Sequence, residues 1–104
     1  RIRTSLTASA TPHGASAPHE VTLIDLSVDG SLVSSTSALC ATGDLVRLDF
    51  SIGAENPVRL LTLARVCHSH EGTSEEGFLT GVLFENMSAT ARVSLKDFVL
   101  SNLD

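Results

Sequence analysis

The sequence predicts a mainly β domain, namely a six-stranded antiparallel barrel with one C-terminal α-helix. Six segments alternate apolar and polar residues or are rich in β-branched residues, and short turns join most of them. Many Val, Leu, Ser and Thr residues, with no Trp or Tyr, favour strands over a helical bundle. A chain of this length fits one core, so we expect residues 1–104 to form a single domain. Its start on Arg1 rather than Met suggests a fragment of a longer protein.

The N-terminal part of the chain predicts three strands. Residues 1–11 alternate between two faces, and the loop PHGASAP at 12–18 ends this strand with two Pro and one Gly. The next strand covers residues 19–28. An Asp-Gly turn at 29–30, which tolerates positive φ, leads into the short strand SLVSS at 31–35.

The C-terminal part predicts three more strands and the helix. LVRLDFSI at 45–52 has the clearest alternation, and the apolar run at 57–70 is read as a strand because of its β-branched content and its bounding Pro and Gly. An acidic hairpin, which contains Glu75 and Glu76 as a solubilising tip, leads into FLTGVLFE at 78–85. Ser88 is a candidate N-cap. The residues that recur after it at helical spacing are Ala91, Leu95, Phe98 and either Asn102 or Leu103.

Charge, hydropathy and cysteine content each argue against a class of partner or location. A formal net charge of −5, with only seven Lys and Arg residues, argues against a DNA- or RNA-binding face, although a small anion needs only two or three cations. No apolar run approaches the roughly 18 residues of a membrane span. Two cysteines, Cys40 and Cys67, form no disulfide framework, so we expect reduced thiols and a cytoplasmic location.

Catalysis and metal binding find little support in the sequence. Cys67, His68 and His70 resemble a ligand group, but on a strand Cys67 would point away from both histidines, and no second ligand pair lies at a recognised spacing. No G-x-S-x-G motif accompanies the many serines. We therefore expect neither an enzyme nor a metal site.

The stretch IDLSVDGSLV at 24–33 is the best candidate for a binding site. On a strand, Ile24, Leu26 and Val28 share one face, and Asp25 and Ser27 share the other, about 7 Å apart. The plain interpretation is a solvent-facing strand before a hairpin. The alternative is a ligand site, in which the carboxylate and the hydroxyl face a bound molecule.

The residues around this stretch resemble the PilZ family, the bacterial receptor module for cyclic di-GMP. Asp25-Leu26-Ser27-Val28-Asp29-Gly30 fits the family motif Asp/Asn-x-Ser-x-x-Gly in full. Arg1 lies where the second arginine of the family's Arg-x-x-x-Arg motif would lie, and the first would precede the chain. The resemblance extends over ATGDLVRLDFSI, LLTLARVCHS and GVLFENMSATARVSLKDFV.

This resemblance implies a noncatalytic receptor that couples binding of cyclic di-GMP to a conformational change or to a partner. It implies ligand contacts from Arg1, Asp25, Ser27 and Gly30, with Arg3 as a further candidate, and no other cofactor. Cyclic di-GMP carries two phosphates and two guanines. Guanidinium groups suit it because they pair with phosphate in a fork and reach guanine O6 and N7. The alternative is a PilZ-like protein-interaction module that has lost the nucleotide, since one motif arginine is not observed.

Overall fold

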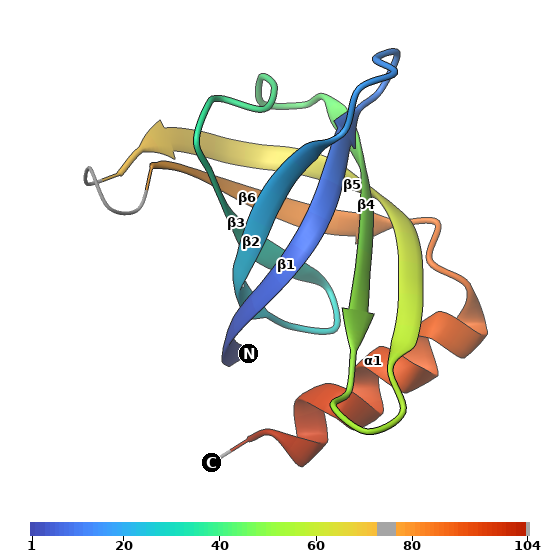
Figure 1. The fold of residues 1–104 in the computed structure, drawn as a ribbon. Coiled ribbons are helices and arrows are strands. Elements are labelled where there is room, and N and C mark those ends of the chain that lie inside the picture. Colours follow the sequence, from blue (N-terminus) through green and yellow to red (C-terminus); the bar gives the residue numbers. More distant parts are fainter. Residues whose placement is uncertain (73–76, 104) are drawn as a thin grey trace.

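The computed structural model describes residues 1–72 and 77–103. It confirms the predicted mainly β fold, with six antiparallel strands closed into a barrel in the order β1-β2-β3-β6-β5-β4 and one C-terminal helix (Figure 1). The elements are β1 (Ile2–Pro12), β2 (His19–Leu26), β3 (Gly30–Ser35), β4 (Leu45–Ile52), β5 (Val58–Glu71), β6 (Phe78–Glu85) and α1 (Ala89–Ser101). The predicted acidic tip at Glu75 and Glu76 lies outside the described residues.

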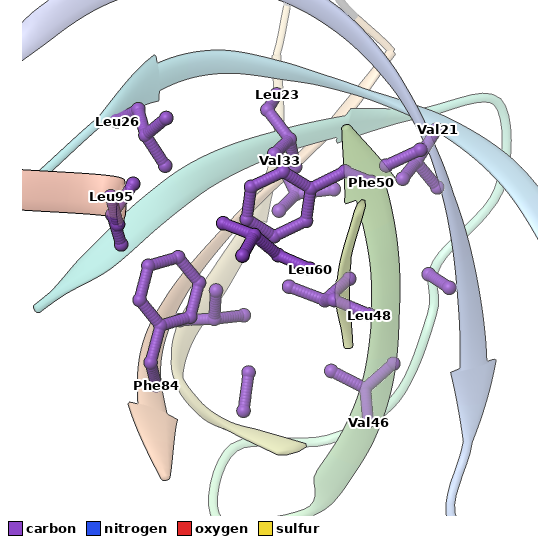
Figure 2. Packing of buried hydrophobic residues seen from close by; sticks show 14 of the residues in the cluster. Val21, Leu23, Leu26, Val33, Val46, Leu48, Phe50, Leu60, Phe84 and Leu95 are labelled. Atoms are coloured by element: carbon purple, nitrogen blue, oxygen red, sulfur yellow. The ribbon is translucent and has the colours of Figure 1, made fainter. Parts of the chain in front are cut away.

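Alternating side chains of the strands fill the barrel. On β4 the inward residues are the predicted ones, Val46, Leu48, Phe50 and Ile52, and all four are buried. The Phe50 and Phe84 rings stack with their centroids 6.1 Å apart, inside the cluster drawn in Figure 2. A closed sheet leaves no unpaired edge along most of its length. Most of the core cluster comes from its strands, and Leu39, Leu95 and Val99 join the cluster from outside the sheet.

Helix α1 covers one end of the barrel. The predicted N-cap is confirmed, because the Ser88 hydroxyl accepts a hydrogen bond from the Ala91 N–H at 3.1 Å. Leu95 and Val99 are buried, and Leu95 enters the same cluster as the strand residues (Figure 2). Ala91 and Phe98 pack against the core from partly exposed positions. The helix therefore seals the apolar interior at this end.

A β-bulge in β2 overturns part of the predicted alternation. Leu23 pairs with Val33 of β3, and Asp25 pairs with the adjacent Leu32, so Ile24 is an extra residue in β2. Leu23 and Leu26 are fully buried, whereas Ile24 is only half-buried. The prediction that Ile24, Leu26 and Val28 share one face of a strand was therefore wrong, and β2 ends at Leu26. The bulge lets Ile24 lie beside Asp25 on the outer surface.

Gly30 serves a different purpose from the one predicted. It begins β3 and has no positive φ. The prediction that the Asp-Gly pair is used for a turn with positive φ was therefore wrong for Gly30. A Cβ on Gly30 would clash with the carbonyl oxygen of Val82 in β6. The glycine is needed because the β3 and β6 backbones approach each other closely.

Candidate functional site

Asp25 lies on the outer surface of the barrel, where its carboxylate has two partners. Oδ1 accepts a hydrogen bond from the Leu32 N–H at 2.8 Å, which fixes the side chain against β3. Oδ2 lies 3.4 Å from Nη1 of Arg1, an open ion pair. The Asp25 side chain is 16% exposed, whereas Arg1 is 62% exposed. The carboxylate is therefore held by the sheet, and Arg1 contacts it from the solvent side.

Arg3 completes the group of charges. It faces Asp25 directly in the β1–β2 register and is exposed. Within the described residues it has no ion pair or hydrogen bond from its side chain. Arg3 is therefore available to bind an anion from outside the chain, without first breaking an existing contact.

These residues surround an open hollow of about 580 Å³. It is lined by Arg1, Ile2, Arg3, Thr4, Ile24, Asp25 and Leu32. The register of β1 against β2 shifts between Arg3 and Leu6, near the β2 bulge at Ile24. Such shifts bend and twist strands locally, and here they lie where the sheet is hollowed.

Ser27 lies beside the hollow rather than in its lining. Its hydroxyl accepts hydrogen bonds from the Asp29 N–H at 3.3 Å and the Gly30 N–H at 3.1 Å, and it lies 3.2 Å from the Gly30 carbonyl oxygen. The Ser27 N–H also donates to that carbonyl at 2.9 Å. Ser27 therefore holds the turn between β2 and β3 in shape.

The same turn contacts two other elements. The Asp29 carbonyl accepts a hydrogen bond from the Phe84 N–H of β6 at 2.8 Å. The Asp29 carboxylate, whose side chain is 80% exposed, lies 3.8 Å from Nη2 of Arg92 on α1. The motif turn is thus linked to the barrel wall and, loosely, to the helix.

The structure brings together three of the five predicted site residues. Arg1, Arg3 and Asp25 line one hollow, whereas Ser27 and Gly30 build the adjacent turn. Sequence reasoning missed the other four lining residues, which are Ile2, Thr4, Ile24 and Leu32. Leu32 is directly opposite Asp25 across the bulged pair, a register that the sequence does not signal.

The other group considered in the sequence, Cys67, His68 and His70, lies near the C-terminal end of β5. Cys67 is the extra residue of a second bulge, in β5 opposite β6, and it is exposed. His68 and His70 stack with ring centroids 6.0 Å apart. Among residues 1–72 and 77–103, no three His, Cys, Asp or Glu side chains are placed so that they could hold a metal ion together. In that same part of the chain, no helix is long and apolar enough to cross a bilayer.

Comparison with known proteins identifies the fold and the family. Residues 1–101 match the PilZ domain family. The chain belongs to the PilZ family. Its structure is similar to that of the Bacillus subtilis inhibitor of motility MotI/DgrA, with a TM-score of 0.81 and 16% sequence identity. The alignment covers 96% of this chain and 48% of that one, so this chain spans about half the length of its structural neighbour. No curated protein matches the sequence.

PilZ domains are generally noncatalytic receptors for cyclic di-GMP. The lining of the hollow on β1, β2 and β3 can therefore be compared with the chemical groups of this nucleotide. A hollow lined by two guanidinium groups and one anchored carboxylate provides donors for phosphate oxygens and an acceptor for guanine N–H groups. The described residues thus present both kinds of partner on the outer face of this PilZ barrel.

Proposed function

We propose that this PilZ domain is a noncatalytic receptor for cyclic di-GMP in the bacterial cytoplasm. One observation carries the proposal: Arg1, Arg3 and Asp25 surround a single open hollow on the outer wall of the barrel. The ligand is a dianion with two guanines, so it needs cations for its phosphates and acceptors for its bases. The hollow offers both types of group within one surface.

The two arginines differ in how they would bind. Arg3 has no internal partner among the described residues, so a phosphate takes its guanidinium without displacing another contact. Arg1 contacts Asp25 at 3.4 Å and is mostly exposed, and such pairs contribute at most about 1 kcal/mol. Exchanging this carboxylate for a phosphate therefore costs little. Asp25 then accepts from guanine through Oδ2, while Oδ1 stays bound to Leu32.

Ser27 and Gly30 support the site through the turn. The Ser27 hydroxyl is already engaged with Gly30, and Gly30 lies against Val82. We infer that both residues act mainly by fixing the backbone next to Asp25, with a direct contact to the ligand as a secondary role for Ser27. The ion pair between Asp29 and Arg92, at 3.8 Å, links this turn to α1 and offers a route to a neighbouring domain or partner.

Titration calorimetry with cyclic di-GMP tests the proposal. Arg3→Ala removes a charged donor with no internal partner, so it is expected to weaken binding by about tenfold without changing stability. Asp25→Ala is expected to weaken binding by at least about tenfold as well. Arg59→Ala is the control, because Arg59 is paired with Asp49 outside the lining of the hollow and its loss should leave the affinity unchanged.

Binding that is unaffected by Arg3→Ala and Asp25→Ala would place the nucleotide elsewhere. If the unmodified chain gives no binding heat and no spectral change at high nucleotide concentration, the receptor proposal is wrong. The alternative, a PilZ module that binds only proteins, would then be favoured.

A further inference from the structure

A second surface lies on the half of the barrel away from the nucleotide hollow. The outer side chains of β5 include Leu61, which is 55% exposed, and Leu63, which is half-buried. Leu61 faces Asp49 and Leu63 faces Arg47 in the β4–β5 register. These leucines help to line a groove of about 460 Å³ together with Arg47, Thr62 and Asn86. We call it the Arg47 groove.

The groove follows from the unequal lengths of two strands. The β5–β6 pairing ends where Leu63 faces Glu85, and β5 continues to Val58. Asn86 then takes a left-handed conformation with φ of 57°, which turns the chain out of the sheet. Residues 58–62 consequently have β4 as their only paired strand in the described part of the chain. Along residues 58–62, β5 therefore has no paired strand on the edge that would face β6.

The charges on this face are balanced except at Arg47. Arg59 forms a bidentate pair with Asp49, at 2.9 and 2.6 Å, and Arg65 pairs with Glu85 at 2.6 and 3.2 Å. Arg47 is exposed and has no hydrogen bond or ion pair among residues 1–72 and 77–103. It leaves one uncompensated positive charge beside two leucines, in a chain whose formal net charge is −5.

We propose that the Arg47 groove binds a protein segment that presents apolar side chains next to a carboxylate. The leucines supply apolar area, and Arg47 supplies the donor that pairs with a carboxylate in a fork. A single uncompensated cation on this face is too few for a polyanion such as nucleic acid, which needs several cations along its backbone. In the barrel order the groove lies on β4 and β5, whereas the nucleotide hollow lies on β1, β2 and β3. The two linings have no residue in common, so a partner in the groove uses none of the residues that line the hollow.

The test is an amide NMR titration of the complete chain with the peptide acetyl-Ser-Leu-Glu-Leu-Gly-amide. Shift changes are expected at residues 45–49, 60–64 and 85–87 with an affinity in the millimolar range. Arg47→Glu and Leu61→Lys are each expected to weaken binding by about fivefold or more. A peptide with Lys in place of Glu should bind at least about fivefold more weakly than the original.

Two controls match the two substitutions. Arg3→Glu matches Arg47→Glu, because it makes the same change in charge in the hollow of Arg1, Arg3 and Asp25. Leu83→Lys matches Leu61→Lys, because it places a cation at another exposed leucine outside the groove lining. Neither should change the affinity. Equal binding of the Lys peptide, insensitivity to Arg47→Glu, shifts that cluster on α1, or no shift at about 5 mM peptide would each overturn the proposal.

Discussion

The carboxylate of Asp25 has a structural role as well as the proposed binding role. Asp25→Ala removes the acceptor for the Leu32 N–H and is expected to lower the free energy of unfolding by about 1–2 kcal/mol. Asp25→Asn retains an acceptor oxygen, so its loss of stability should be under about 1 kcal/mol. Urea unfolding of both variants measures this difference. Equal losses would show that the contact with Leu32 contributes little.

Gly30 gives a second test at the scale of single residues. Gly30→Ala places a methyl group against the Val82 carbonyl oxygen, and we expect a loss of about 3 kcal/mol in the free energy of unfolding. Gly14→Ala is the control. Gly14 has φ of 87°, and no atom lies within 4 Å of the place that a Cβ would take. Only the left-handed backbone penalty of about 1 kcal/mol therefore applies. Thermal or urea unfolding that ranks Gly14→Ala as the more damaging change would contradict this explanation.

The two thiols should react at different rates. Cys67 is exposed on its bulge, whereas Cys40 is half-buried. Burial, and then the nearby Asp44 carboxylate, raise the pKa of the Cys40 thiol, which lowers its thiolate fraction near neutral pH. A disulfide reagent such as Ellman's reagent should modify Cys67 about tenfold faster than Cys40. Comparable rates, measured with Cys67→Ser as a reference, would show that Cys40 is more accessible than the structure indicates.

At the scale of elements, α1 stabilises the barrel through one face only. Leu95→Ala should lower the free energy of unfolding by about 3 kcal/mol, because the side chain is fully buried. Leu100→Ala removes the same side chain from a position that is 56% exposed, and it should change stability by no more than about 0.5 kcal/mol. Urea unfolding compares the two, and similar effects would mean that α1 packs in another orientation.

The accuracy of the sequence prediction varied with the regularity of each strand. Residues 45–52 and 78–85 were predicted with the observed bounds, since strict alternation or a clear apolar run between turns determines an ordinary strand. In β2 the prediction failed at Ile24, because a bulge depends on pairing with another strand and leaves no local signal. Gly30 was recognised as important, but a glycine is needed there because Val82 of β6, more than fifty positions away along the chain, leaves no space for a Cβ.

The candidate site shows the same limit. Asp25 was placed on the outer surface correctly, and Arg1 and Arg3 were named with it. The lining residues Thr4 and Leu32 come from strands whose register could not be read from the sequence. The motif resemblance supplied the ligand that we propose, and the pairing of strands determined which side chains share the hollow.

At the scale of the whole molecule, exposed ion pairs should give a weak dependence of stability on pH. Hydrogen bonds from Arg59 lower the pKa of Asp49 below its ordinary value. This stabilisation is complete above the unfolded-state pKa of about 3.9 and is lost as the pH falls through the lower folded-state pKa. Asp49→Asn should therefore lower stability by less than about 1 kcal/mol at pH 7, since the pair is exposed to solvent. Urea unfolding at pH 7 and at about pH 3 should show the difference shrinking at the lower value. A difference that grows on acidification would contradict the sign.

The closed barrel separates two outer surfaces, and the receptor proposal requires the nucleotide to occupy only one of them. The most direct test is an amide NMR titration of this chain with cyclic di-GMP. We predict the largest shift changes at residues 1–4 and 24–32, with smaller changes in the first turn of α1 around Arg92 and none on the outer face of β4 and β5. Shift changes confined to other parts of the barrel, or none at saturating nucleotide, would contradict the proposal that the Arg1, Arg3 and Asp25 hollow binds cyclic di-GMP.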